Sequence, residues 1–150
     1  MKSKNKNKKE LAKSKIKVSD SDFSLQRINS LQQYLMEVSK IPMLTHEEEI
    51  LFARRLKEKG DIEAARKLVA SNLRIVVKIA LEYQSAYSNV LDLIQEGNIG
   101  LMKAVSKFDP ERGVRLIYYA SWWIRSYILK YIIDNFRMVK IGTTQAQKKL

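Results

Sequence analysis

Helical spacing of apolar residues is the feature that most limits the folds open to this chain. Apolar side chains recur every three or four residues, as Ile28, Leu31, Leu35 and Val38 do, and no strong strand-like alternation is present. The 150 residues include only two prolines and five glycines, and 45% of them are hydrophobic. The sequence therefore predicts an all-α fold, a compact helical bundle with enough apolar surface for a core.

Capping residues predict where the helices begin and end. Thr45 with Glu48 three residues later forms a capping box, and Gly60 suits the position that follows a last helical turn. Asp61 and Asp92 are each expected to cap a following helix. The predicted helices cover about residues 27–39, 46–59, 62–84, 92–107 and 116–136, with a loop at SAYSNVL (85–91) and a turn at FDPERG (108–113).

The formal net charge of +12 indicates an acidic partner. Nucleic acid is the first choice and an anionic membrane surface the second, while solubility alone is the simpler explanation. Residues 2–17 hold eight lysines against one acid, so residues 1–24 are predicted to be a disordered basic tail. Residues 103–149 hold ten cations against three acids within apolar periodic sequence, which places this second excess on a folded surface.

Several function classes have no support in the sequence. There is no cysteine and only one histidine, no phosphate-binding loop, no dinucleotide fingerprint, and no apolar run long enough to cross a membrane. Asp92 and Glu96 lie one turn apart and could bind a cation, but a capping role for Asp92 is simpler. We therefore expect no catalytic residue, no metal and no cofactor, a protein that is not an enzyme, and no membrane partner.

The stretch YYASWWIRSYILKY (118–131) holds six aromatic rings in fourteen residues. At 100° per residue, one face is apolar and suits a core, and the other carries large rings and a cation. Exposed rings beside cations suit base stacking. Packing against another helix or a partner protein remains open. The predicted inner face holds Ile117, Ala120, Ile124, Tyr127, Ile128 and Tyr131, and the outer face Tyr119, Trp122, Trp123, Ser126 and Lys130.

The helix predicted over 92–107 also has two faces. The core side includes Gly97, and another helix lying close would offset the cost of Gly97 and Gly100 in a helix. The opposite side mixes polar and apolar residues, which suits either solvent or a protein partner. The core side holds Leu93, Ile94, Gly97, Leu101, Ala104, Val105 and Phe108, and the outer side Asp92, Gln95, Glu96, Asn98, Ile99 and Met102.

Three strings resemble the central domain of bacterial RNA polymerase sigma factors of the primary-type superfamily: NLRIVVKIA (72–80), DLIQEGNIGLMKAVSKFDPERG (92–113) and YYASWWIR (118–125). GVRL and VKIGTTQAQKKL are similar to the heat-shock (RpoH-like) branch. The resemblance covers about residues 28–150. It implies region 1.2-like helices over 25–60, a region 2 helical core over 61–140, and the start of a truncated next domain over 141–150.

The resemblance implies a transcription initiation factor that docks on the clamp helices of core RNA polymerase and melts the promoter −10 element by capturing flipped non-template bases. In the family, one flipped adenine is held at the upstream fork of the bubble and a second base further downstream. The polymerase-binding residues would be Leu73, Val76, Asp92, Gln95, Glu96, Asn98 and Met102. The DNA-binding residues would be Phe108, Arg112, Tyr119, Ser121, Trp122 and Trp123 for the first base, Asn72 and Arg74 near the second, and Arg125, Ser126 and Lys130 along the helix.

The chain departs from the family pattern in two respects. Ser126 and Leu129 stand where relatives use amide or hydroxyl side chains to read the upstream base pair, and Val114 replaces an aromatic residue, so the preferred −10 sequence should differ. The chain also ends where the next domain would begin. The alternatives are a truncated paralogue that binds the polymerase clamp without productive promoter recognition, and a nonspecific nucleic-acid binder. Further implied partners are an anti-sigma regulator or a chaperone, in the cytoplasm.

Overall fold

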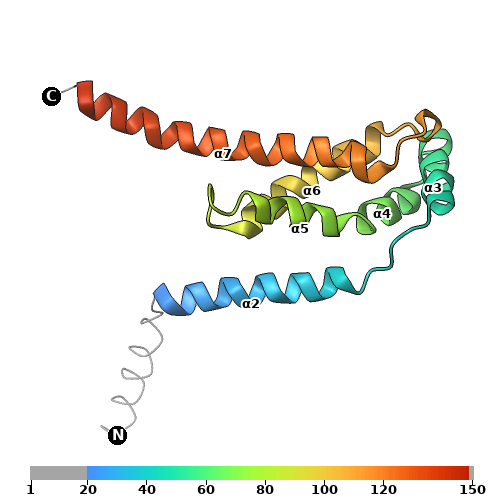
Figure 1. The fold of residues 1–150 in the computed structure, drawn as a ribbon, viewed down its shortest axis with the longest axis horizontal. Coiled ribbons are helices and arrows are strands. Elements are labelled where there is room, and N and C mark those ends of the chain that lie inside the picture. Colours follow the sequence, from blue (N-terminus) through green and yellow to red (C-terminus); the bar gives the residue numbers. More distant parts are fainter. Residues whose placement is uncertain (1–19, 149–150) are drawn as a thin grey trace, which may run out of the picture. The chain divides into compact units, whose positions relative to one another are not determined.

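Helices make up the fold of the described part of the chain (Figure 1). The structure is a computed structural model that describes residues 20–148, with side chains for residues 21–136. Within this range there is no strand, which confirms the predicted all-α class. No helix in this range has both the length and the apolar content needed to cross a membrane. The elements are α2 (Asp20–Ser39), α3 (His46–Lys59), α4 (Ile62–Ala70), α5 (Leu73–Glu82), α6 (Val90–Lys107), η1 (Pro110–Arg112) and α7 (Leu116–Lys148).

The chain forms two compact units, residues 1–36 and residues 37–150. In the first unit, residues 1–19 of the expected tail lie outside the described residues. Residues 20–36 form most of α2, which begins at Asp20 and not near residue 27 as predicted. Residues 20–24 were therefore wrongly assigned to the tail.

The capping signals of α3 and α4 are confirmed. The Glu48 backbone N–H donates to Thr45 Oγ1 at 3.2 Å, and Gly60 adopts a left-handed φ of 62° just after the helix. Asp61 accepts from the backbone N–H groups of Glu63 and Ala64 at 3.0 and 3.3 Å. These bonds satisfy donors that the first helical turn leaves without intrahelical partners.

The single helix predicted over 62–84 is wrong, because the chain breaks between α4 and α5. The Ser71 hydroxyl and the Asn72 side-chain amide both donate to the carbonyl of Leu68, at 3.1 and 2.8 Å. Such local bonds compete with helical hydrogen bonds and favour a turn. Asn72 has φ −113° and ψ 8°, outside the helical range, so α5 starts afresh at Leu73.

The predicted capping role of Asp92 is also wrong. Helix α6 begins at Val90, with Asn89 at the capping position, so Asp92 lies within the first turn. Its carboxylate accepts a hydrogen bond from the Tyr87 hydroxyl at 3.0 Å. At the other end of the fold, α7 continues past the expected end at Phe136 to Lys148, since no proline interrupts this segment.

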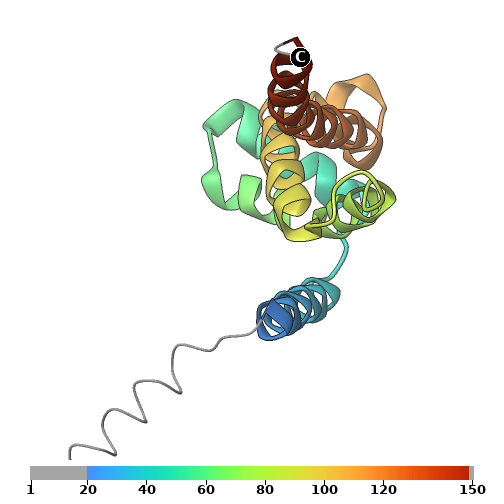
Figure 2. The same cartoon turned by 90° about the vertical axis from the view of Figure 1, so that its left-hand side faces the viewer.

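The core of the second unit forms where α6 meets its neighbours (Figure 2). Helix α6 is contacted by α4, α5 and α7, and its pairing with α7 is the most extensive. The residues predicted for the inner face of α6 are all buried, and so are Ala120, Ile124 and Ile128 of α7. The predicted inner-face residues Ile117, Tyr127 and Tyr131 are only half-buried.

Two glycines let α7 approach α6 closely. A Cβ at Gly100 would lie 2.8 Å from the carbonyl oxygen of Trp123 and 3.2 Å from Ile124 Cα. A Cβ at Gly97 would meet Val76 Cγ1 at 2.7 Å and Ile128 Cδ1 at 3.2 Å. The close helix contact expected from these glycines is therefore present. At Gly100 the obstacle is backbone, which cannot rotate away.

Gly100→Ala is expected to lower the free energy of unfolding by about 1–2 kcal/mol. Overpacking costs about 1–3 kcal/mol, with the upper part of this range expected against rigid backbone, and the better helix propensity of alanine returns about 1 kcal/mol at most. Chemical unfolding measures the difference. Gly97→Ala is the comparison, because its added methyl group meets the side chain of Val76 and not backbone. Combining it with Val76→Ala should remove part of that clash. Stability unchanged or raised in Gly100→Ala would contradict the packing described here.

Candidate nucleic-acid interface

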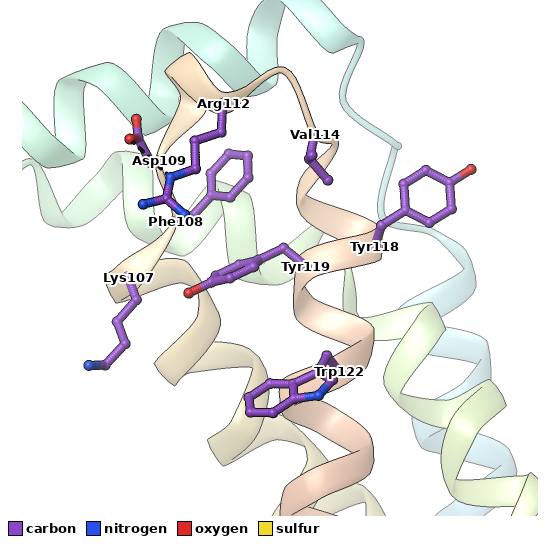
Figure 3. A pocket seen from close by; sticks show the side chains of 8 residues that line it. All are labelled: Lys107, Phe108, Asp109, Arg112, Val114, Tyr118, Tyr119 and Trp122. Atoms are coloured by element: carbon purple, nitrogen blue, oxygen red, sulfur yellow. Dashed lines mark ion pairs between the residues drawn. The ribbon is translucent and has the colours of Figure 1, made fainter.

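The turn after α6 and the first turns of α7 enclose an open cavity of about 450 Å³ (Figure 3). The Tyr119 and Trp122 side chains extend from the same side of α7, and the Phe108 ring lies beside Tyr119, whereas Tyr118 points to the other side of the helix. Aromatic carbon and two cationic groups thus face the same space. The lining residues are Lys107, Phe108, Asp109, Arg112, Val114, Tyr118, Tyr119 and Trp122.

The rings near the cavity form a continuous series. The Phe108 and Tyr119 ring centroids are 5.9 Å apart, and those of Tyr119 and Trp123 are 6.3 Å apart. Trp122 and Trp123 meet edge to face at 5.3 Å, with their planes 88° apart. Since edge-to-face packing holds ring orientations, the aromatic surface is fixed before any ligand arrives.

The two tryptophans differ in exposure. The Trp122 side chain is open to solvent, with 65% of the residue exposed. Trp123 is half-buried, its indole Nε1 is buried, and among the described residues this atom has no hydrogen-bond partner. The Lys107 Nζ lies 5.9 Å from the centre of the Trp123 ring, within cation–π range. Trp122 is therefore the ring available for stacking, and Trp123 packs against it edge to face.

The cavity rim is a short turn held by its own side chains. Asp109 accepts from the Glu111 backbone N–H at 3.0 Å, Pro110 starts the η1 turn, and Gly113 closes it at φ 74°. Arg112 Nε lies 3.7 Å from an Asp109 oxygen, yet the Arg112 side chain is 82% exposed. The rim thus fixes the base of Arg112 and leaves its guanidinium group accessible.

Ion pairs join helix α3 to this rim. Arg54 donates to both carboxylate oxygens of Glu111, at 2.7 and 3.3 Å, and Lys57 donates to Asp109 at 3.1 Å. The bond from Arg54 holds the pKa of Glu111 below its ordinary value, and the Glu111 N–H and then Lys57 do the same for Asp109. We call these two pairs the rim ion pairs.

Glu49, also on α3, holds the start of α7. It is 4% exposed, and its Oε2 accepts from the Leu116 backbone N–H and from Arg115 Nε, both at 3.3 Å. A carboxylate is well placed here, because the first turn of a helix carries partial positive charge. Sequence analysis did not single out Glu49, since its partners lie more than sixty residues away.

Along α7, three predicted DNA contacts already have protein partners. Arg125 donates to Glu82 at 2.6 Å, and this bond raises the pKa of Arg125 and lowers that of Glu82. The hydroxyls of Ser121 and Ser126 donate to helix carbonyls, at 2.6 and 2.7 Å, so each retains only acceptor capacity outward. Lys130 is exposed.

The two residues predicted near a second base lie apart from this cavity. Asn72 is 7% exposed and lines a smaller cavity of about 140 Å³ together with Glu49, Arg115 and Tyr118. Arg74 is exposed at its surface, but it donates to the carbonyls of Ser39 and Ile41, at 2.7 and 2.8 Å. Asn72 and Arg74 therefore do not line the first cavity, although Tyr118 borders both cavities.

The predicted polymerase-binding residues form an uneven surface on α5 and α6, which we call the docking ridge. Gln95 is exposed and Met102 is 52% exposed. Val76 is 0% exposed, so its side chain packs beneath the ridge and offers no surface of its own. The half-buried members are Leu73, Asp92, Glu96 and Asn98.

Several cavity residues were absent from the predicted DNA-binding set. Lys107 belongs to the second basic excess, and Asp109 belongs to the turn between two predicted helices. The sequence therefore predicted where both residues lie but not that they line a cavity. Tyr118 was the reference point of the helical wheel. Val114 was considered only as a departure from relatives. Their shared cavity depends on how the turn folds over α7, which spacing does not report.

Residues 68–137 match the family model described as Sigma-70 region 2, and residues 29–62 match Sigma-70 factor, region 1.2. Together the two matches span well over half of the chain. The chain belongs to the sigma-70 family.

Sigma-70 family relatives are similar over most of this chain but are longer. The chain is 53% identical over 122 residues to the RNA polymerase sigma-C factor of Myxococcus xanthus. It is 52% identical over 120 residues to the sigma factor RpoH of Caulobacter vibrioides strain NA1000 and 53% identical over 121 residues to RpoH of Zymomonas mobilis. These matches cover 80–81% of the chain but only 40–41% of each relative. The chain therefore spans about two fifths of their length, and the predicted similarity to RpoH is confirmed.

Acid should remove the stabilising effect of the rim ion pairs. The folded pKa values of Asp109 and Glu111 lie below the ordinary 3.8 and 4.5, so the pairs stabilise the fold above those values and lose this effect as pH falls through the folded pKa values. The Asp109→Asn/Glu111→Gln double variant should be less stable than the parent at about pH 7, and the difference should narrow below about pH 4. Urea unfolding of the parent and the double variant, at about pH 7 and below about pH 4, measures this difference in stability.

The matched control for the rim ion pairs is Glu63→Gln, which removes an exposed carboxylate that pairs only within α4. A stability difference for the double variant that is equally large at both pH values would contradict an ionic role for the rim carboxylates.

Proposed function

We propose that this chain acts as the polymerase-docking and −10-recognising part of a transcription initiation sigma factor. The docking ridge binds the clamp helices of core RNA polymerase, and the aromatic cavity captures a flipped non-template base of the promoter −10 element. The observation that carries this proposal is the open cavity lined by Phe108, Tyr119 and Trp122 beside exposed cations.

Energetics favour base capture at this cavity. Taking a base out of the duplex costs a few kcal/mol. Stacking on an aromatic ring returns about 1–3 kcal/mol per base. The Trp122 and Tyr119 rings are each held edge to face by Trp123, so little ordering remains to be done when the base enters. One or two captured bases therefore offset the cost of opening without a source of chemical energy.

Cations around the cavity would hold the strand. Lys107 and Arg112 lie at the cavity, and Lys130 is exposed further along α7. Phosphate contacts of this kind act on any sequence and weaken as salt rises. Base choice would then depend on the cavity itself and on the surface of α7 beyond it.

Upstream base reading on α7 is expected to differ from that of general-promoter relatives. The Ser126 hydroxyl donates to the Trp122 carbonyl at 2.7 Å, and Leu129 is 44% exposed with no polar group. Neither residue can make a paired amide contact to a base edge. The proposal therefore includes a preferred −10 sequence that departs from the general consensus at this position.

The proposed division of the chain keeps residues 25–60 as region 1.2-like helices, 61–140 as region 2, and 141–150 as the start of a further domain. The rim ion pairs and Glu49 connect α3 to the DNA-facing turn, so the first part would support the second. A regulatory partner, either an anti-sigma factor or a chaperone, and a cytoplasmic location belong to the same proposal.

Trp122→Ala should reduce binding of a single-stranded −10 oligonucleotide to the polymerase-bound chain about 5- to 150-fold, because about 1–3 kcal/mol of stacking is lost. Binding of the chain to core polymerase should change little. Fluorescence anisotropy measures both affinities. Phe136→Ala is the control, since Phe136 is an exposed aromatic residue of α7 that does not line the cavity.

Equal loss of both affinities in Trp122→Ala would contradict the division between a docking ridge and a base-capturing cavity. Normal polymerase binding by the parent chain, with no oligonucleotide binding under any condition, would favour the alternative of a clamp-binding interaction module. Sequence-independent DNA binding that disappears in salt would favour nonspecific binding.

Glu82→Gln should strengthen binding of the oligonucleotide. Glu82 accepts a 2.6 Å bond from Arg125, so a DNA phosphate must compete with this carboxylate for the guanidinium group. Removing the charge frees Arg125 for one more phosphate contact, and the salt dependence of binding should steepen by about one counterion. The control Glu63→Gln removes the same charge from a pair within α4. No change in affinity or salt slope would show that Arg125 is not on the strand's path.

A further inference from the structure

A chain of three polar side chains links three segments of the second unit. The Tyr87 hydroxyl donates to Asp92 Oδ2 at 3.0 Å and lies 3.1 Å from the Tyr131 hydroxyl. Tyr87 belongs to the loop between α5 and α6, Asp92 to the first turn of α6, and Tyr131 to α7. All three residues are half-buried. None of the capping or packing roles described above accounts for this arrangement.

Proton directions in this chain follow from the groups themselves. An ionised carboxylate only accepts, and each phenol has one proton to donate. Tyr87 therefore donates to Asp92, and Tyr131 donates to the Tyr87 oxygen. The pKa of Tyr87 is raised above its ordinary value, first by its contact with the Tyr131 hydroxyl and then by burial and the Asp92 carboxylate. Tyr87 stays protonated and keeps donating throughout the physiological range.

Ring packing fixes where the Tyr87 hydroxyl stands. The Tyr87 and Tyr131 rings meet edge to face, with centroids 5.3 Å apart and planes at 72°. Tyr131 is carried by α7, whose inner face is buried against α6. The donor that reaches Asp92 is thus held by the core and does not depend on the loop alone.

Asp92 lies at one end of the docking ridge, on the same helix as Gln95 and Met102. We propose that Tyr87 and Tyr131 are positioning residues for polymerase docking, which hold the Asp92 carboxylate in the orientation that the clamp helices bind. This inference rests on the proposed function, because it assigns Asp92 to the polymerase interface. Charged groups of the polymerase would then meet the Asp92 Oδ1 atom already in the orientation that they bind.

The expected effect is moderate and lies in affinity. Without the Tyr87 hydroxyl, the Asp92 side chain recovers rotamer freedom that must be lost again on docking. The loss of one ordered side chain corresponds to about three- to tenfold weaker binding. The helix start should survive the change, because Asp92 is not the capping residue of α6 and the ring of Tyr87 remains.

The experiment measures the Kd of the full chain for core RNA polymerase in the parent, Tyr87→Phe, Tyr131→Phe, Asp92→Ala and the Tyr87→Phe/Asp92→Ala double variant. Thermal unfolding of each is recorded alongside. Tyr127→Phe is the matched control, because it removes a phenol from a half-buried tyrosine of α7 that is outside the chain of three.

We expect Tyr87→Phe to weaken binding about three- to tenfold, with an unfolding midpoint close to that of the parent, and Tyr131→Phe to have a smaller effect in the same direction. In the Asp92→Ala background, Tyr87→Phe should have no further effect on Kd. This absence identifies a role through Asp92, which a merely structural tyrosine would not show.

An equal loss from Tyr87→Phe with and without Asp92 would overturn the inference, and so would unchanged Kd in Tyr87→Phe when Asp92→Ala weakens binding. Failure of the parent chain to bind core polymerase would instead contradict the proposed function. If Asp92→Ala leaves Kd unchanged while the parent binds, docking stands and the assignment of Asp92 to it fails.

Discussion

The close approach of α6 and α7 is the contact on which the rest of the structure depends. It requires glycine at position 100, where an added methyl group would meet the backbone of Trp123 and Ile124. With the two helices this close, their apolar faces are covered by one another, as the full burial of Leu101 and Ile124 shows. Rings on their outer faces, which any core would accept, are then not needed for this packing.

One helix pair thus supports two different surfaces. On α7 the outer face carries Trp122 at 65% exposure, and beside it the turn after α6 adds Phe108 and Arg112 to the same cavity. On α6 the outer face carries the acid and amide groups of the docking ridge. Ion pairs and hydrogen bonds from neighbouring segments hold both surfaces in place: the rim ion pairs and Glu49 on one side, and Tyr87 and Tyr131 on the other. Each proposed binding surface is thus held partly by residues that we do not assign to binding.

Sequence alone predicted much of this fold, because the signals concerned were local. The capping groups of Thr45, Gly60 and Asp61 act within four residues, and the two-faced pattern of α6 needs only the helical period. The errors have local causes too: the side chains of Ser71 and Asn72 compete with the helix that periodicity favoured, and α6 starts at Val90, ahead of Asp92. The cavity was less predictable. The wheel placed both tryptophans outward, but only the folded rim and the neighbouring rings leave Trp122 open and Trp123 half-buried. Contacts such as those of Glu49 join distant segments and have no signature in spacing.

We propose that a ring surface held outside the core captures one or two unpaired bases while the docking ridge binds polymerase. The most direct measurement places the fluorescent base 2-aminopurine at each position of a −10 non-template oligonucleotide in turn and binds it to the chain on core polymerase. We expect strong quenching by ring stacking at one or two positions, with little change at their neighbours. Fluorescence that changes equally at every position, or at none while the oligonucleotide is bound, would contradict it.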